Sequence, residues 1–162
     1  MSAADRQVTE GIDRLCQAIS GDLSGPPVVV GIHTGGVWLA QALRDRLWPQ
    51  APLSRLNISF HRDDFARIGL HPQVGASDMQ EDVEGRTLLL VDDVLHTGRT
   101  VRAAMNELFD FGRPAAIRLA VLVDRGGREL PIAADYTGLQ RDVAPDQQIK
   151  LEGPEPLTLV LR

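Results

Sequence analysis

Three apolar runs constrain the fold of this chain more than any other feature of its sequence. They span residues 28–32, 87–91 and 117–123, and they consist mostly of Val, Leu, Ile and Ala. A run without polar alternation is typical of a strand buried on both faces, as in a parallel sheet covered by helices. Because segments with helical spacing lie between the runs, we predict an α/β fold with a mostly parallel central sheet and helices on both faces.

The rest of the chain extends this pattern within one domain. A chain of 162 residues is long enough to bury one sizeable core and short for two. We therefore expect a single domain over residues 1–162. The additional predicted helices cover residues 5–20, 37–47 and 100–111, and the additional predicted strands cover residues 56–60, 135–139 and 157–161.

Residues 61–85 sustain neither a helical nor a strand period. A segment of this length without regular structure is usually functional when it lies inside a compact domain. We predict that it forms a mobile hood, or lid, that closes over a ligand.

Composition bounds the class of protein. The net charge is −5, which is the opposite of the charge expected of a nucleic-acid binder. The single cysteine, Cys16, lies on the apolar stripe of the predicted helix 5–20; it excludes an intramolecular disulfide and is typical of a reducing compartment. No stretch approaches the roughly 20 apolar residues that a membrane span requires. We expect a cytoplasmic protein that does not enter a membrane.

One segment carries the chemistry that the sequence predicts. Residues 88–100 read LLLVDDVLHTGRT, so a hydrophobic strand is followed by two carboxylates, a short turn and the start of a helix. Backbone N–H groups at a helix N-terminus, here Thr97 to Thr100, favour a phosphate group. Asp92 and Asp93 can accept hydrogen bonds from the vicinal hydroxyls of a ribose. The segment therefore predicts a site for a ribose 5-phosphate unit, and it lacks the lysine of an ordinary P-loop.

The same segment resembles a known loop. Residues 91–105, VDDVLHTGRTVRAAM, resemble the phosphoribosyl pyrophosphate loop of type I phosphoribosyltransferases. Together with GRP at 112–114 and LAVLVDRGGRELPI at 119–132, they are similar to the pyrimidine operon attenuator/uracil phosphoribosyltransferase family. The resemblance covers about residues 28 to 139. It implies a type I phosphoribosyltransferase fold.

The resemblance also implies an activity and its partners. The reaction would transfer the phosphoribosyl group of 5-phosphoribosyl 1-pyrophosphate (PRPP) to uracil, giving UMP and pyrophosphate. Family members use Mg²⁺ and assemble as homodimers or homotetramers. A second implied role is a UMP-responsive regulator of pyrimidine genes that binds attenuator RNA.

Individual residues receive roles from this resemblance. Catalytic roles are implied for Arg62 in the hood and for Asp92 and Asp93, and the two aspartates would also hold Mg²⁺ through water. The residues implied to bind PRPP are Thr34, Gly35, Gly36, Asp92, Asp93, Val94, Leu95, His96, Thr97, Gly98, Arg99 and Thr100, and those implied to contact the base are Val123, Asp124 and Arg125.

The pyrophosphate loop departs from the family pattern. The family typically has Lys-Thr-Arg-Gly where this chain has His33, Thr34, Gly35 and Gly36, so two cations are missing. Backbone amides can still bind pyrophosphate there, and the titratable His33 makes the affinity sensitive to pH. We predict reduced but real activity.

Two other functions stay open at this point. One is an RNA-binding attenuator with little or no catalysis, and the other is a purine phosphoribosyltransferase, because the sequence does not fix the hydrogen-bonding edge of the base. Few cations are available for RNA: the predicted first helix has only Arg6 and Arg14, Ala134 interrupts a usually basic site, and residues 138–141 carry little charge. RNA binding should therefore be weak and strongly dependent on salt.

Overall fold

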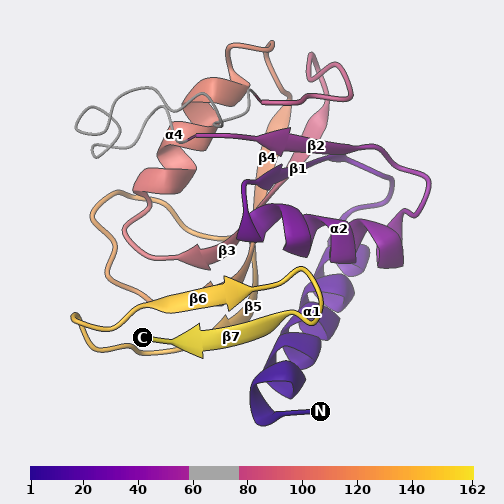
Figure 1. The fold of residues 1–162 in the computed structure, drawn as a ribbon. Helices are drawn as coiled ribbons and strands as arrows, with labels where there is room; N and C mark the ends of the chain where they lie inside the picture. The colour runs from indigo at the N-terminus through magenta and orange to yellow at the C-terminus, as the bar shows by residue number, and fades with distance from the viewer. Residues whose placement is uncertain (59–76) are drawn as a thin grey trace.

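The computed structural model describes residues 1–58 and 77–162. Figure 1 shows a central sheet with helices packed against it and a separate hairpin near the C-terminus. Among the described residues, no helix is both long enough and apolar enough to cross a membrane. The elements are α1 (Ala3–Asp22), β1 (Val28–Ile32), α2 (Gly35–Leu47), β2 (Leu53–Leu56), β3 (Thr87–Leu95), α4 (Arg99–Leu108), β4 (Ala116–Asp124), β5 (Tyr136–Gln140), β6 (Ile149–Glu152) and β7 (Thr158–Leu161).

Five strands form a parallel sheet in the order β2-β1-β3-β4-β5. The central strands β1, β3 and β4 are the three apolar runs of the sequence. Every residue of β1 is buried, as expected of a strand covered on both faces. The predicted α/β class with a parallel sheet is confirmed.

Helices cover both faces of this sheet, and β3 shows how. Its side chains alternate between the faces, so Leu89 and Val91 pack in the cluster that contains α1 and α2. Leu88 and Leu90 pack in the second cluster, with α4. Cys16 is buried in the first cluster, where burial raises the pKa of its thiol. The prediction of helices on both faces is confirmed.

The second strand lies earlier than predicted. We predicted residues 56–60 from apolar alternation, but β2 ends at Leu56, and Ser59 and Phe60 lie outside the described residues. The strand is defined by parallel pairing with β1, in which Leu53 lies opposite Val29. Its polar residues are accommodated by tertiary contacts: the buried Ser54 hydroxyl accepts a hydrogen bond from the backbone of Gln80 at 2.8 Å.

The strand β3 is longer than predicted. We expected it to end at Val91, where the polar residues begin, but pairing with β4 continues to Leu95 opposite Asp124. Asp92 and Asp93 are therefore part of a strand, which fixes their backbone. The connection from β3 to α4 contains only residues 96–98.

The hairpin of β6 and β7 is antiparallel and separate from the main sheet. We predicted a strand at 157–161 but none at 149–152. Ile149, Leu151 and Leu159 bury the hairpin against the cluster that contains α1 and α2. Because β6 contacts β3 and β7 contacts α1, the hairpin extends the molecule beside the end of the central sheet (Figure 1).

Residues 77–85, which we included in the predicted hood, contact the body of the protein. Asp78 pairs with Arg55 of β2 in an isolated bridge, and Val83 is fully buried. Arg62 and the other residues of the hood up to 76 lie outside the described residues. One domain over residues 1–162 with a hood at 61–85 stays a prediction.

Candidate ligand site at the carboxyl edge of the sheet

A cavity of about 440 Å³ lies where β1 and β3 end. It brings together two segments that the sequence analysis singled out, residues 33–36 and the acidic pair. Ligands of parallel α/β sheets bind beyond the carboxyl ends of the strands, so this is the expected edge. The lining residues are Ile32, His33, Thr34, Gly35, Trp38, Asp92, Asp93, Val94, Thr100, Lys150 and Leu151.

A second cavity of about 160 Å³ adjoins the first and follows the loop from β3 into α4. Asp92, Val94 and Thr100 line both cavities, so the two are neighbours that share part of their walls. Most of the residues predicted to bind PRPP meet here. The lining residues of the smaller cavity are Asp92, Val94, Leu95, His96, Thr97, Gly98, Thr100 and Val101.

Asp92 and Asp93 lie past the last residue of β3 that pairs with β1, which is Val91. As successive residues of a strand they project to opposite faces. Asp92 is 6% exposed and accepts a hydrogen bond from the Asp93 backbone at 2.9 Å. Asp93 accepts one from the Val94 backbone at 2.9 Å. The two carboxylates are therefore held on either side of the strand end. Both aspartates line the larger cavity, and of the two only Asp92 also lines the smaller one.

The N-terminus of α2 borders the larger cavity. Gly35 and Gly36, predicted to bind PRPP, are the first two residues of this helix, and Thr34 is its cap. The helix can start this close to β3 only because both residues lack a side chain. A Cβ on Gly35 would overlap Oδ2 of Asp93, and one on Gly36 would lie 2.5 Å from the Val91 carbonyl oxygen.

The N-terminus of α4 borders the smaller cavity. Gly98 caps the helix with φ of 92°, a left-handed conformation that favours glycine. The first helical hydrogen bond runs from the Arg102 N–H to the Gly98 carbonyl, so the amides of Thr100 and Val101 precede the helical ladder. The Thr97 carbonyl accepts hydrogen bonds from the backbone of residues 129 and 130, which holds the loop in place. Two helix N-termini thus flank the acidic pair.

His96 contributes a titratable ring to the smaller cavity. Its ring lies against Gly127, where a Cβ would be 2.9 Å from Nε2. Burial, and next the positive charge of Arg125, lower the pKa of His96 below its usual value. Both effects favour the neutral form of the ring.

The three residues predicted to contact the base make structural contacts. Val123 is fully buried and packs in the core cluster of α1 and α2. Burial raises the pKa of Asp124, but hydrogen bonds from Arg128 at 2.5 Å and from the Gly126 backbone at 2.9 Å outweigh it, so the pKa is lowered. Arg125 donates to two backbone carbonyls of the segment before β6. None of the three lines either cavity.

Three lining residues of the larger cavity lie outside the segments that were predicted to bind a ligand. Trp38 lies in α2, and Lys150 and Leu151 lie in β6. The helical spacing of α2 identified Val37 and Ala40 as core positions without indicating what Trp38 faces. Lys150 and Leu151 come from a strand about 57 residues beyond Asp93 in the chain, and local patterns contain no information on such a contact.

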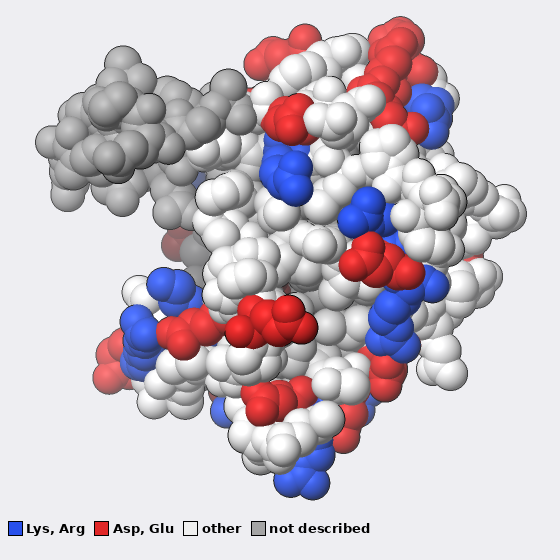
Figure 2. Space-filling view, turned by 45° about the vertical axis from the view of Figure 1, so that its right-hand side comes forward, with Lys and Arg blue, Asp and Glu red and all other residues white. Residues whose placement is uncertain are grey.

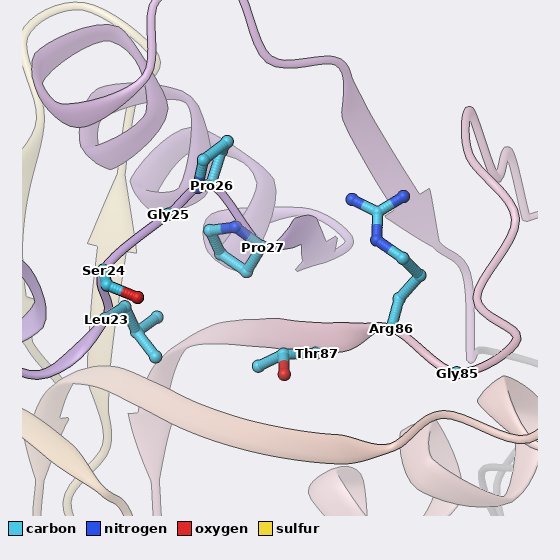
Figure 3. Close-up of a pocket in the computed structure, with 8 residues that line it drawn as sticks. All are labelled: Leu23, Ser24, Gly25, Pro26, Pro27, Gly85, Arg86 and Thr87. Atoms are coloured by element: carbon cyan, nitrogen blue, oxygen red, sulfur yellow. The ribbon is translucent and has the colours of Figure 1, made fainter.

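A further hollow lies at the opposite edge of the sheet. Figure 3 shows its residues in two segments, the turn 23–27 between α1 and β1 and residues 85–87 at the start of β3. Its cation, Arg86, lies 3.6 Å from Glu81. None of the predicted ligand-binding residues lines this hollow.

Comparison with known proteins decides the family. The protein-family model that describes the phosphoribosyl transferase domain matches residues 4–157 of this chain. The chain belongs to the phosphoribosyltransferase family. This confirms the superfamily that the resemblance of residues 91–105 predicted.

Relatives narrow this assignment. The chain is 58% identical over 133 residues to the bifunctional protein PyrR of Nitrosococcus oceani, covering 81% of this chain and 75% of that protein. It is 56% identical over 136 residues to the bifunctional protein PyrR of Pseudomonas savastanoi pv. phaseolicola, covering 84% and 80%. The predicted family of pyrimidine operon attenuators and uracil phosphoribosyltransferases is confirmed.

Solved structures show the same fold. A hypoxanthine-guanine phosphoribosyltransferase from Bacillus anthracis matches with a TM-score of 0.68 at 21% identity, over 88% of this chain and 82% of that chain. A purine phosphoribosyltransferase from Pyrococcus horikoshii matches with a TM-score of 0.66 at 21% identity, over 85% and 84%. These matches confirm the type I phosphoribosyltransferase fold.

Proposed function

We propose that this phosphoribosyltransferase transfers the phosphoribosyl group of PRPP to uracil and releases UMP and pyrophosphate. One observation carries the proposal: Asp92 lies between two adjoining cavities, each bordered by the N-terminus of a helix. PRPP has a diol with a phosphate on one side and a pyrophosphate on the other. An acidic pair flanked by two anion-binding helix ends matches that order of groups.

Each part of the site then has one task. The amides at the start of α4 bind the 5-phosphate in the smaller cavity, where Gly98 leaves room for close approach. Asp92 and Asp93 accept hydrogen bonds from the ribose hydroxyls. The amide of Gly35, which lines the larger cavity at the start of α2, binds the pyrophosphate there. Gly36, the next residue of the helix, does not line the cavity.

The reaction needs no covalent intermediate with the protein. A ring nitrogen of uracil forms a bond to the anomeric carbon as the bond from that carbon to the pyrophosphate oxygen breaks. The pyrophosphate leaves with the electron pair of that bond, and the proton of the uracil nitrogen passes to the pyrophosphate or to water. Positive charge develops on the ribose ring, and we assign its stabilisation to the carboxylates of Asp92 and Asp93. Catalysis comes mainly from positioning the two reactants and excluding water. We assign water exclusion to the predicted hood and charge stabilisation on pyrophosphate to Arg62.

The donor groups fit Mg²⁺ that arrives with the substrate. No cluster of three or more acidic, histidine or cysteine side chains suited to a metal occurs in the described residues. Asp92 and Asp93 are two oxygen donors at the cavity, which suits a hydrated Mg²⁺ that keeps most of its water and binds substrate phosphates. When bound, Mg²⁺ supplies neutralisation of the leaving pyrophosphate.

Uracil is supported as the base by identity of more than half of the matched positions to the PyrR relatives. The purine enzymes among the solved structures are only 21% identical and carry information on the fold alone. The test is an assay of uracil, hypoxanthine, guanine and orotate side by side with PRPP and Mg²⁺. We expect UMP as the main product. Formation of IMP or GMP at a higher rate would show a purine enzyme instead.

We also propose a second activity as a UMP-responsive regulator of pyrimidine genes. The relatives are named bifunctional proteins, and the chain shares 56–58% of its matched residues with two of them. Titration of the leader RNA of pyrimidine genes, with and without UMP, tests this role. Assembly as a homodimer or homotetramer and a cytoplasmic location stay predictions, the first of which light scattering after size-exclusion chromatography checks.

A further inference from the structure

The C-terminal hairpin brings a lysine to the larger cavity. Lys150 is the single lysine of the 162-residue sequence, and it lies in the middle of β6. Among the described residues that line the cavity, it is the only lysine or arginine. The other ionisable groups of the lining are His33 and the carboxylates of Asp92 and Asp93.

The register of β6 turns the Lys150 side chain away from the core. Its neighbours Ile149 and Leu151 are buried, whereas Lys150 is exposed, as the alternation of a strand requires. In residues 1–58 and 77–162, no carboxylate forms an ion pair with Lys150. Among the described residues, no ion pair therefore competes with a ligand for this ammonium group.

Contacts before and after β6 hold the lysine at this place. Before the strand, the Arg125 guanidinium donates to the Gln147 carbonyl at 3.0 Å. After the strand, Gly153 packs against the Trp38 ring so closely that a Cβ would lie 3.1 Å from Cε3. Because Trp38 also lines the cavity, the hairpin and the start of α2 form two neighbouring walls of it.

The ligand that this arrangement suits is a polyphosphate. The larger cavity has two carboxylates and a loop, residues 33–36, that has neither lysine nor arginine. A pyrophosphate group bound there needs a cation, and an ammonium group makes short, charge-assisted hydrogen bonds to phosphate oxygens. We propose that Lys150 binds the pyrophosphate group of PRPP and supplies the positive charge that residues 33–36 lack. This inference rests on the proposed phosphoribosyl transfer, which makes PRPP the ligand.

Calorimetric titration of the full chain tests the inference. PRPP with Mg²⁺, pyrophosphate with Mg²⁺, and UMP are each titrated into the unchanged protein, Lys150→Met, Lys150→Arg and Arg162→Met. The last variant is the matched control, because Arg162 is an exposed cation of the same hairpin that lines neither cavity. Circular dichroism and thermal unfolding establish that the variants are folded.

Lys150→Met is expected to lower the affinity for PRPP and for pyrophosphate by about ten- to a hundredfold. This is the range for the loss of a hydrogen bond to a charged group. The affinity for UMP, which has no pyrophosphate group, should change by less than about twofold. Lys150→Arg should recover most of the affinity, and Arg162→Met should resemble the unchanged protein. The proposed role of Lys150 would be overturned if the unchanged protein and Lys150→Met bound PRPP with equal affinity, or if Lys150→Met lost the same affinity for PRPP and for UMP. Either result would leave the proposed phosphoribosyl transfer untouched. Absence of PRPP binding to the unchanged protein would overturn the phosphoribosyl transfer as well.

Discussion

Gly35 shows how closely the site is packed at the scale of single residues. A Cβ at this position would overlap Oδ2 of Asp93, so Gly35→Ala must displace that carboxylate. We expect kcat/KM for PRPP to fall by about a hundredfold, because misplacement of a positioning group by about 1 Å costs that much. Steady-state kinetics with uracil and PRPP measure the change.

Two other glycines separate this effect from a loss of fold. Gly36→Ala places its Cβ 2.5 Å from the Val91 carbonyl oxygen, which is backbone and cannot move aside. Its free energy of unfolding should fall by about 1–3 kcal/mol, as for overpacked cores. Gly21 in α1 has nothing within 4 Å of its Cβ position, so Gly21→Ala should leave both activity and stability intact. Full activity of Gly35→Ala would contradict the packing described for Asp93.

The ionisation of Tyr136, the single tyrosine of the chain, depends on its contact with Asp22. The Tyr136 hydroxyl donates a hydrogen bond to the Asp22 carboxylate, which ties the start of β5 to the end of α1. Burial and this carboxylate raise the pKa of Tyr136 from 10.0 to about 12. The folded state holds the proton more tightly than the unfolded state, so this contribution to stability is complete below pH 10 and is lost as the pH rises toward 12.

Absorbance at 295 nm measures this ionisation directly, because no other tyrosine is present. We expect the folded protein to titrate near pH 12 and the protein in urea near pH 10, with circular dichroism establishing the folded state at each pH. Asp22→Asn removes the negative charge and should move the midpoint of the folded protein toward 10. A midpoint near 10 in the unchanged folded protein would disprove the contact.

Residues of the site differ in how far the sequence predicts them. Asp92, Thr97 and Gly98 were predicted because a strand, an acidic pair and a helix start follow one another within 13 residues, which fixes their relative positions locally. Lys150 was not predicted, because its position depends on the docking of a distant hairpin. The side chains of Val123 and Arg125 line neither cavity, and their contacts are with the core and the segment before β6.

At the scale of elements, the docking of the hairpin on α2 is open to test. Trp38 is half-buried, packs against Gly153 and lines the larger cavity. Trp38→Ala should lower the free energy of unfolding by about 2 kcal/mol, less than the 3–5 kcal/mol of a fully buried tryptophan. It should also raise the KM for PRPP, because the hairpin that carries Lys150 loses a contact.

Trp48, the second tryptophan of the chain, supplies the matched control. It is also half-buried but lies at the far end of α2 and lines neither cavity. Trp48→Ala should lose similar stability without a change in the KM for PRPP. Urea unfolding and steady-state kinetics measure both quantities. An unchanged KM in Trp38→Ala would show that the hairpin is positioned without this contact.

Elements were predicted where one local pattern determined them. The strand at 28–32 was predicted with its correct bounds, because a short, unbroken apolar run that turn residues enclose indicates a strand buried on both faces. The strand β2 was placed too late, since its register comes from β1 and its buried Ser54 is satisfied by Gln80. The strand β6 was missed because it has only four residues, which alternate between apolar and charged, and such a short segment becomes a strand only when it pairs with β7.

At the scale of the whole molecule, charge decides how RNA can be bound. The chain has 22 acidic and 17 basic residues, and on the face seen in Figure 2 the cations are interspersed with acidic residues rather than gathered in one patch. The fold does place a cation of α1 and the cation that follows β5 along the same boundary between these two elements. Arg14 donates to the Gly138 carbonyl at 3.2 Å, and Arg141 donates to Gln7 at 3.3 Å. Arg6 is a further cation of α1, so these two segments, which are distant in sequence, carry a small basic group of three residues.

This small group sets the salt dependence that we expect of RNA binding. Each phosphate contact on single-stranded RNA contributes about −0.7 to the slope of log K against log salt, so three cations predict a slope of about −2. A gel-shift titration of pyrimidine leader RNA at several salt concentrations measures it, with UMP present throughout. Replacing Arg14 and Arg141 by alanine should bring the slope to about −0.7, whereas Arg113→Ala, away from α1 and β5, should leave it unchanged. A slope of about −6 or steeper would mean that a larger basic surface, such as one built from two copies of the chain, contacts the RNA.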